Sequence, residues 1–371
     1  MRKICVVTTT RAEYGIMSRL IEMINKDENL ELKLIVSGMH LSAKFGMTVN
    51  EIKQPVTKKI DIQIEKEPYY SVSIAVKEFS ETFKKIKPDI ILILGDRYEI
   101  FAAAQAAMLN NIPIAHIHGG ETTQGAIDEA IRHSITKMSH LHFVSCEQYG
   151  KRVVQLGENP DRVFNVGALG VENIKKTPLM TKKELQKSLE FDFKEKNFLI
   201  TFHPVTLEGN SPEQFNELLN ALEKYKNYGM IFTAPNSDTG NEELFELLNN
   251  FVDTHNNAKL YKSLGVVRYL SAIKYCDVVI GNSSSGIIEV PSFKKPAVNI
   301  GNRQKGRVMA QSVINCKPVY EDILNSINIA LSKDFSKTVN PYDKENTAEN
   351  ILKVLKNYPL KNILFKEFYD L

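Results

Sequence analysis

The chain has 371 residues, which at roughly 150 residues per domain predicts two domains. Hydrophobic residues make up 43% of it and charged residues 25%, both ordinary for a globular protein, so wholesale disorder is excluded. Its 47 basic and 44 acidic side chains leave a net charge of +3, too small an excess to indicate a nucleic-acid partner.

Cysteine usage and the apolar runs indicate where the protein works. The four cysteines, Cys5, Cys146, Cys276 and Cys316, include no CxxC pair, which favours a reduced intracellular protein. The first apolar stretch is too short for a signal peptide, and no run approaches the ~18 apolar residues of a membrane helix. We therefore expect a cytoplasmic protein without a membrane partner.

In the first half of the chain, short apolar runs alternate with segments of helical spacing. The runs are rich in Val and Ile and apolar nearly throughout, as in parallel strands that helices cover on both faces. Between the first two runs, Ile16, Leu20 and Ile24 share one helical face. The expected strands are residues 3–8, 31–37, 89–95, 113–118, 141–145 and 163–167.

The second half repeats this pattern after a polar, highly charged segment at residues 177–196. Strand–helix alternation of this kind predicts an α/β fold with two Rossmann-like, doubly wound domains. We expect domains at 1–170 and 171–354, with the tail, about 355–371, packing on the first domain. The expected strands here are residues 197–202, 230–233, 259–261, 277–281 and 296–301.

Charged and small polar residues follow the expected strands in both halves. The clearest examples are TTRAEYG after the first strand, GDRYE after the third and HGGE after the fourth. Ligands of open α/β sheets bind beyond the carboxyl ends of the strands. We therefore expect a ligand in a cleft between the two domains.

The segment Gly281–Gly286, GNSSSG, indicates a phosphate or diphosphate site. It follows an expected strand and precedes an expected helix, so small residues, three hydroxyls and free N–H groups would meet the ligand. It matches neither the P-loop nor GxGxxG. A serine-rich helix cap without a ligand has the same composition, so both interpretations stay open.

Histidines are concentrated between residues 116 and 142, which contain five of the eight. His116 and His118 share one face of a strand, as two metal ligands or as partnered core residues. Dense ligand spacing such as HExxH is absent, so we expect no metal and no cofactor.

Several carboxylates are candidates for acid–base chemistry. Asp96 follows a buried strand, where burial would raise its pKa. Arg97 beside it is an anion clamp or an ion-pair partner. Asp128 and Arg132 are four residues apart on a helix, which a surface ion pair would also explain. Glu121 completes the group.

Eight motifs, taken in chain order, together carry a family resemblance. They are TTTRAEYG at 8–15, SGMH at 37–40, GDRYEIF at 95–101, HIHGGE at 116–121, DEAIRHSITKMSHLH at 128–142, FHP at 202–204, GNSSSGIIEVPS at 281–292 and NIGNRQKGR at 299–307. This set resembles the hydrolysing UDP-N-acetylglucosamine 2-epimerase family. The similarity is closest to the bacterial sialic-acid branch and to sister enzymes that act on diacetamido-trideoxy sugars for legionaminic acid.

The resemblance implies two Rossmann-like domains facing a cleft, the GT-B arrangement, and a homodimer. It implies conversion of UDP-N-acetylglucosamine and water to N-acetylmannosamine and UDP, for sialic-acid biosynthesis. The implied route is anti elimination to a 2-acetamidoglucal followed by hydration, without cofactor or metal. The alternative is the same reaction on UDP- or GDP-N,N'-diacetylbacillosamine for legionaminic acid.

The resemblance also assigns roles by motif position. It places acid–base chemistry on Asp96 and Asp128, together with His118 or Glu121. The positions that it implies for binding substrate and UDP are Arg11, His40, Arg97, Arg132, His203, Asn236, Ser283, Ser284, Ser285, Gly286, Glu289 and Arg303.

Two departures from the family pattern affect this assignment. Many relatives read HIEGGE, so His118 stands where they have a glutamate. Either His118 carries the proton transfer, which its ordinary pKa near 6.5 permits, or Glu121 does. Gly15 and Ile16 follow the tyrosine where the family often has a lysine, so another residue would supply that cation.

Three other functions remain open. A GT-B glycosyltransferase shares the nucleotide half but would not need the Asp96/Asp128 pair. A non-hydrolysing epimerase has motif variants that these motifs do not resemble. A non-catalytic sensor of nucleotide sugars is disfavoured by the number of acid–base candidates.

Overall fold

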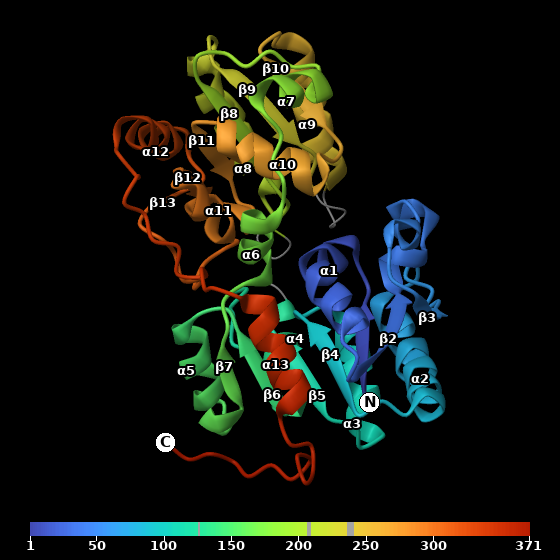
Figure 1. Cartoon of the computed structure of the whole chain (residues 1–371). Coiled ribbons are helices and arrows are strands. Elements are labelled where there is room, and N and C mark those ends of the chain that lie inside the picture. Colours follow the sequence, from blue (N-terminus) through green and yellow to red (C-terminus); the bar gives the residue numbers. More distant parts are fainter. Residues whose placement is uncertain (125–126, 206–208, 236–240) are drawn as a thin grey trace. The chain divides into compact units, whose positions relative to one another are not determined.

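The structure, a computed structural model, describes residues 1–124, 127–205, 209–235 and 241–371. The chain divides into two compact units, each of which is a parallel sheet with helices on its faces (Figure 1). Unit 1 contains Met1–Glu121, Ile127–Asn173 and Lys344–Leu371. Unit 2 contains Ile174–Asp343 and a short segment that begins at Thr122.

Unit 1 has a seven-stranded sheet in the order β3-β2-β1-β4-β5-β6-β7. The order reverses between β1 and β4, so the loops after these two strands leave the sheet side by side. The elements are β1 (Arg2–Thr8), α1 (Arg11–Lys26), β2 (Leu30–Ser37), β3 (Val56–Ile60), α2 (Pro68–Ile86), β4 (Ile90–Leu94), α3 (Tyr98–Leu109), β5 (Ile114–Ile117), α4 (Asp128–Met138), β6 (Leu141–Val144), α5 (Glu147–Gln155), β7 (Val163–Asn165) and α13 (Thr347–Asn357).

Unit 2 has a six-stranded sheet in the order β10-β9-β8-β11-β12-β13, which reverses between β8 and β11. Its elements are α7 (Lys182–Leu189), β8 (Asn197–Thr201), α8 (Ser211–Leu222), β9 (Gly229–Thr233), α9 (Asn241–Thr254), β10 (Ala258–Tyr261), α10 (Gly265–Tyr275), β11 (Val278–Gly281), α11 (Ser285–Ile288), β12 (Ala297–Ile300), β13 (Val313–Cys316) and α12 (Tyr320–Ser332). Helix α6 (Leu169–Lys176) joins the two units along the chain.

Both sheets are buried on both faces, which explains their continuous apolar strands. In β1, Ile4 and Val6 pack into one core while Cys5 and Val7 pack into the core on the opposite face. Strand β11 does the same with alternate residues. The predicted α/β fold with two Rossmann-like, doubly wound sheets is therefore confirmed.

Two edge strands, β3 and β13, are not among those expected from the sequence. Val56–Ile60 reads VTKKI, and its three central residues are exposed. Val313–Cys316 is only partly buried and its third residue is exposed. Polar residues are common on sheet edges, where they discourage pairing with another chain, so these strands lack an apolar signature.

The chain returns to unit 1 at Lys344, before the residue near 355 that the sequence indicates. Helix α13 packs against α1 (Figure 1). Its Ala348, Ile351 and Leu355 are fully or almost fully buried in the core of unit 1. An amphipathic helix buries its apolar stripe where a matching face is available, and α1 supplies that face.

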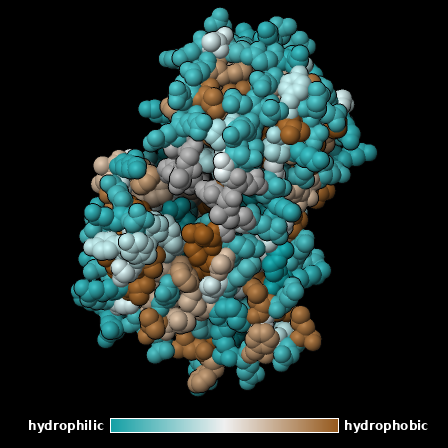
Figure 2. Space-filling view, turned by 180° about the vertical axis from the view of Figure 1, so that it is seen from behind, coloured by the Kyte–Doolittle hydropathy of each residue, from teal (hydrophilic) through white to brown (hydrophobic). Residues whose placement is uncertain are grey.

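Among the described residues, no helix combines the length and the apolar character of a transmembrane span. On the face that Figure 2 shows, hydrophobic residues lie in small groups among hydrophilic ones.

Candidate active site

The first group of candidate residues lies at the carboxyl ends of β4 and β5 in unit 1. Asp96 and Arg97 follow β4, and His118 follows β5. His118 has a φ of 68°, a left-handed conformation that is unusual for a residue with a side chain. Its N–H donates to the carbonyl of Phe143 at 2.9 Å. Strain of this kind persists where surrounding contacts hold it, and it is frequent at functional sites.

Arg132 on α4 brings three of the candidates together. Its guanidinium forms an ion pair with Asp96 and donates to the His118 carbonyl at 3.1 Å. Its Nη1 lies 3.9 Å from Oε2 of Glu121. The side chain of Arg132 is only 4% exposed, so the alternative of a surface ion pair on the helix does not apply.

Glu121 and His118 contact each other directly. Oε1 of Glu121 lies 3.4 Å from Nδ1 of His118 and accepts a hydrogen bond from Oγ of Ser145 at 2.7 Å. Glu121 is 2% exposed. The two residues that compete for the family glutamate's role therefore form one pair.

Asp128, the first residue of α4, differs from Asp96 in its environment. Burial and the negative charge of Asp96 raise the pKa of Asp128 above its ordinary value. Asp96, in contrast, faces the Arg132 guanidinium. Two carboxyl groups with different environments suit opposite roles as acid and base.

Arg97 forms a bidentate ion pair with Glu99, which is fully buried. The two bonds are 3.1 Å from Nε and 2.9 Å from Nη2. The side chain of Arg97 is 37% exposed, so the guanidinium is anchored on one side and accessible on the other. Both interpretations of Arg97, an ion-pair partner and an anion clamp, fit this geometry.

Two predicted binding residues lie apart from this carboxylate group. Arg11 forms a half-exposed ion pair with Glu51 at 2.9 Å. His40 is buried, with Nε2 at 3.2 Å from Oγ1 of Thr8 and Nδ1 at 2.8 Å from Oγ1 of Thr48. Burial lowers the pKa of His40 to about 4. Both ring nitrogens of His40 thus have protein partners.

Two other histidines of the cluster, His116 and His142, are core residues with partners. Nε2 of His116 bonds the carbonyl of Gly95 at 2.8 Å, and burial lowers the pKa of His116 to about 3. Nε2 of His142 bonds Glu158 at 3.0 Å. Within the described part of the chain, no three His, Cys, Asp or Glu side chains are grouped as metal ligands would be. The core interpretation fits these histidines.

The second group of candidates lies at the carboxyl ends of β8, β11 and β12 in unit 2. Gly281 has a φ of 136°, and a Cβ there would lie 1.9 Å from the carbonyl oxygen of Thr201. Only glycine fits, and this brings the GNSSSG backbone against the end of β8. Oγ of Ser283 accepts from the N–H of Ser285 at 3.4 Å. The expected helix, α11, has only four residues, with Ser284 as N-cap and Glu289 as C-cap.

His203 and Arg303 both form hydrogen bonds with Asn282. Asn282 bonds both backbone groups of His203, and Nη1 of Arg303 donates to the Asn282 carbonyl at 3.3 Å. Burial and the charge of Arg303 lower the pKa of His203 to about 3. Gly286 is buried against Ala297. The predicted residue Asn236 lies outside the described residues.

Sequence reasoning misses four residues that support these two groups. Ser145 ends one strand that the sequence predicts and Asn282 directly follows another, so position at a strand end was the available signal. Glu99 gives no separate signal, because its role depends on the buried contact with Arg97. Glu13 accepts the Thr9 N–H at 2.7 Å, and the spacing of Thr10 and Glu13 matches a helix capping box.

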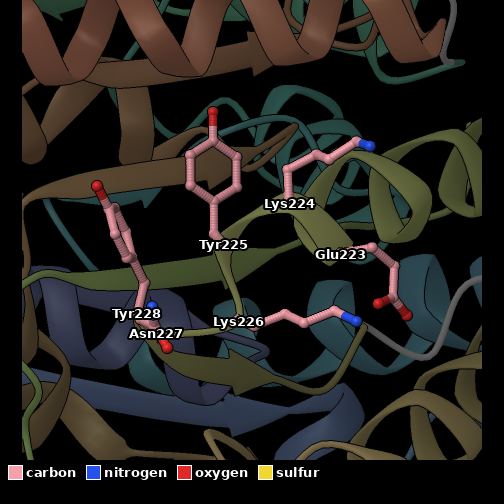
Figure 3. Close-up of a pocket in the computed structure, with 6 residues that line it drawn as sticks. All are labelled: Glu223, Lys224, Tyr225, Lys226, Asn227 and Tyr228. Carbon is pink, nitrogen blue, oxygen red and sulfur yellow. The ribbon is translucent and has the colours of Figure 1, made fainter.

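A surface hollow in unit 2 is not part of either group. Six consecutive residues, Glu223–Tyr228, line it (Figure 3). The hydroxyl of Tyr225 donates to Asn328 at 2.9 Å. One turn of chain without convergent polar groups from other elements gives no reason to expect a ligand there.

Known proteins are similar to this chain over nearly its whole length. The chain is 44% identical to a GDP/UDP-N,N'-diacetylbacillosamine 2-epimerase (hydrolyzing) of Campylobacter jejuni, covering 100% of this chain and 99% of that one. It is 43% identical to the polysialic acid biosynthesis protein P7 of Escherichia coli, with 100% and 98% covered. It is 37% identical to a UDP-N,N'-diacetylbacillosamine 2-epimerase (hydrolyzing) of Legionella pneumophila, with 97% of each covered.

A solved structure has the same fold. S. aureus MnaA, in a co-structure with UDP, superimposes with a TM-score of 0.83 at 19% identity, covering 100% of both chains. The family model described as UDP-N-acetylglucosamine 2-epimerase matches residues 22–356. The chain therefore belongs to the UDP-N-acetylglucosamine 2-epimerase family and is an enzyme that acts on nucleotide sugars.

Proposed function

We propose that the chain is a hydrolysing 2-epimerase, which releases a nucleoside diphosphate from a nucleotide-linked 2-acetamido sugar and inverts carbon 2. The observation that carries this proposal is the group around Arg132. It joins Asp96, His118 and Glu121, and Asp128 has its pKa raised in part by Asp96. Several acid–base groups in one place suit a reaction with two proton transfers at carbon.

The proposed reaction has two steps. A base removes the proton from carbon 2 while the bond between the anomeric carbon and the diphosphate oxygen breaks, which gives a 2-acetamidoglucal. Water then adds to the anomeric carbon as carbon 2 takes a proton on the opposite face. The net change is substrate plus water to the free, epimerised sugar plus nucleoside diphosphate.

The environments of the carboxyl groups suggest their roles. Asp96, which faces the Arg132 guanidinium, suits the base. Asp128, whose pKa is raised, suits the acid that returns a proton. The contacting pair His118 and Glu121 would act on the attacking water or on the second transfer.

The nucleotide in this proposal binds to the loops of unit 2. Its diphosphate would meet the small residues and hydroxyls of Ser283–Ser285, together with His203 and Arg303. A diphosphate leaving group needs N–H, hydroxyl and cationic donors, and these loops carry all three. Glu289 would accept hydrogen bonds from the ribose hydroxyls.

We further propose N,N'-diacetylbacillosamine, linked to UDP or GDP, as the sugar. Two of the three relatives reported above, at 44% and 37% identity, are named for this substrate. UDP-N-acetylglucosamine, giving N-acetylmannosamine for sialic acid, is the second candidate. The name of the E. coli relative at 43% identity favours it.

A substrate panel tests the proposal. The protein is incubated in deuterium oxide with the UDP and GDP forms of both sugars, and the products are identified by NMR. We expect the free 2-epimer of N,N'-diacetylbacillosamine with deuterium at carbon 2. Free N-acetylmannosamine as the preferred product would support the second candidate. An epimer still linked to nucleotide, or no free sugar from any substrate, would refute hydrolytic epimerisation.

Four variants test the residue roles. Asp96→Asn and Asp128→Asn keep shape but remove proton transfer, so each should lower kcat on the order of 10²–10⁴. His118→Ala and Glu121→Gln identify the member of the pair that is essential, because the essential one should match that loss. Normal turnover in all four variants would refute the assignment.

A further inference from the structure

Asn282 ties three loops together at the carboxyl edge of the sheet in unit 2. Its Oδ1 accepts the His203 N–H at 2.7 Å, and its Nδ2 donates to the His203 carbonyl at 2.8 Å. Its own carbonyl accepts from Nε2 of Gln304 at 2.9 Å and from Nη1 of Arg303 at 3.3 Å. Asn282 is fully buried. The loops after β8, β11 and β12 thus meet at one residue.

The side chain of Asn282 extends the hydrogen bonding between β8 and β11 beyond the point where the backbone can continue it. Strands β8 and β11 pair as far as Thr201 and Gly281, and the Asn282 N–H still reaches the Thr201 carbonyl at 3.2 Å. The chain then reads His203-Pro204, and proline has no N–H for a further bond. A side-chain amide presents a donor and an acceptor like a peptide group, so Asn282 fixes His203 beyond the end of the sheet.

This fixation matters because His203 is neutral. With its pKa at about 3, the imidazole carries no charge at physiological pH. A neutral ring attracts an anion only through an N–H that points at it, so its position decides its contribution. Arg303 is oriented by the same residue through its bond to the Asn282 carbonyl.

We propose that Asn282 is a positioning residue for the nucleoside diphosphate, acting through His203 and Arg303. The proposal rests on the function proposed above, in which these two side chains meet the diphosphate. Asn282 itself need not touch the ligand, because it bonds the neighbouring loops.

The chain offers a matched control in Asn197, at the amino end of β8 in the same sheet. Its Oδ1 accepts the Lys194 N–H at 2.9 Å, and its Nδ2 donates to the Lys194 carbonyl at 2.9 Å. It is 1% exposed. Replacing either asparagine by aspartate sets an oxygen against a backbone carbonyl, so Asn282→Asp and Asn197→Asp should disturb folding in the same way.

The test is the affinity for UDP and GDP, by calorimetry, in variants whose fold is checked by circular dichroism. We expect Asn282→Asp to weaken binding of the diphosphate that wild type accepts by about 10- to 100-fold. The affinity of Asn197→Asp for the diphosphate should stay within about twofold of wild type, because Asn197 lies at the amino end of β8, away from the loops that follow the strands. Asn282→Ala, which removes the tie without adding a charge, should weaken binding as well.

A second measurement separates positioning from a general structural effect. In a His203→Ala background the Asn282 tie persists, because it bonds backbone atoms, but one of the side chains that it positions is gone. The loss caused by Asn282→Asp should therefore shrink in that background. An undiminished loss would overturn the proposal, and so would wild-type affinity in Asn282→Asp. If wild type itself binds neither UDP nor GDP, the proposed function fails instead.

Discussion

Replacing Arg132 by lysine is the sharpest test of the group in unit 1. The substitution keeps the positive charge and removes the planar fork of donors. Arg132 reaches both the Asp96 carboxylate and the His118 carbonyl, which belong to loops that follow different strands. A lysine carries its charge and its hydrogen-bond donors on one nitrogen, so it can keep at most one of these partners.

The contacts set the expected size of the effect. Both bonds are donated by the charged guanidinium, and a hydrogen bond to a charged group contributes about 1.5–3 kcal/mol. Because lysine keeps at most one of the two partners, at least one such bond, about 1.5–3 kcal/mol, is lost. If this is lost from the transition state, kcat falls by about 10- to 150-fold.

The assay follows nucleoside diphosphate release with the substrate that the panel identifies. Arg162→Lys is the control, because Arg162 also bonds two partners, the carbonyls of Ile363 at 2.9 Å and Phe365 at 3.1 Å. These partners lie in the C-terminal tail. We expect its kcat to stay within about twofold of wild type.

Two results would refute this reasoning. One is a folded Arg132→Lys enzyme that keeps more than about a third of the wild-type kcat. The other is an equal loss of kcat in Arg162→Lys, which would show that replacing any arginine of unit 1 that donates two hydrogen bonds has the same consequence.

Three further predictions concern stability and metal. Glu158 is 1% exposed and bonds His142, Lys137 and Lys366; burial alone would raise its pKa, but these partners hold the pKa at about 2, below its ordinary 4.5. The ionised Glu158 should therefore stabilise the fold by up to about 3 kcal/mol at pH values above its unfolded-state pKa, and this stabilisation should be lost as the pH falls toward 2. The difference in free energy of unfolding between wild type and Glu158→Gln should accordingly decrease in acid. A difference that stays independent of pH in denaturant titrations would contradict this. Gly120→Ala would set a Cβ 2.4 Å from the Tyr149 carbonyl oxygen at a φ of 76°, whereas Gly15→Ala meets nothing within 4 Å. Thermal unfolding should show Gly120→Ala destabilised by about 2 kcal/mol or more and Gly15→Ala, in the interior of α1, stabilised by about 0.5–1 kcal/mol. A Gly120→Ala variant more stable than Gly15→Ala would contradict this reasoning. Turnover should survive exhaustive chelation with EDTA, and a loss that zinc or manganese restores would identify a metal site.

Strand-end positions were the part of the candidate site that the sequence could predict. Val- and Ile-rich runs identify strands buried on both faces, and the polar residues directly after each run must lie at the carboxyl edge of its sheet. Asp96, His118, His203 and Ser283 are found there. The edge strands β3 and β13 escaped prediction because a half-exposed strand has no continuous apolar run.

Pairing between these positions was decided by the tertiary structure. Arg132 meets Asp96 across 36 residues, and Ser145 meets Glu121 across 24. Nothing local in the sequence selects these partners, since on spacing alone Arg132 pairs with Asp128 one helical turn away. Packing of α4 buries Arg132, and a buried guanidinium must find acceptors wherever the fold supplies them. The sequence by itself therefore determined two doubly wound sheets and the edge at which each group of polar residues lies, while only the fold decided which side chains meet there.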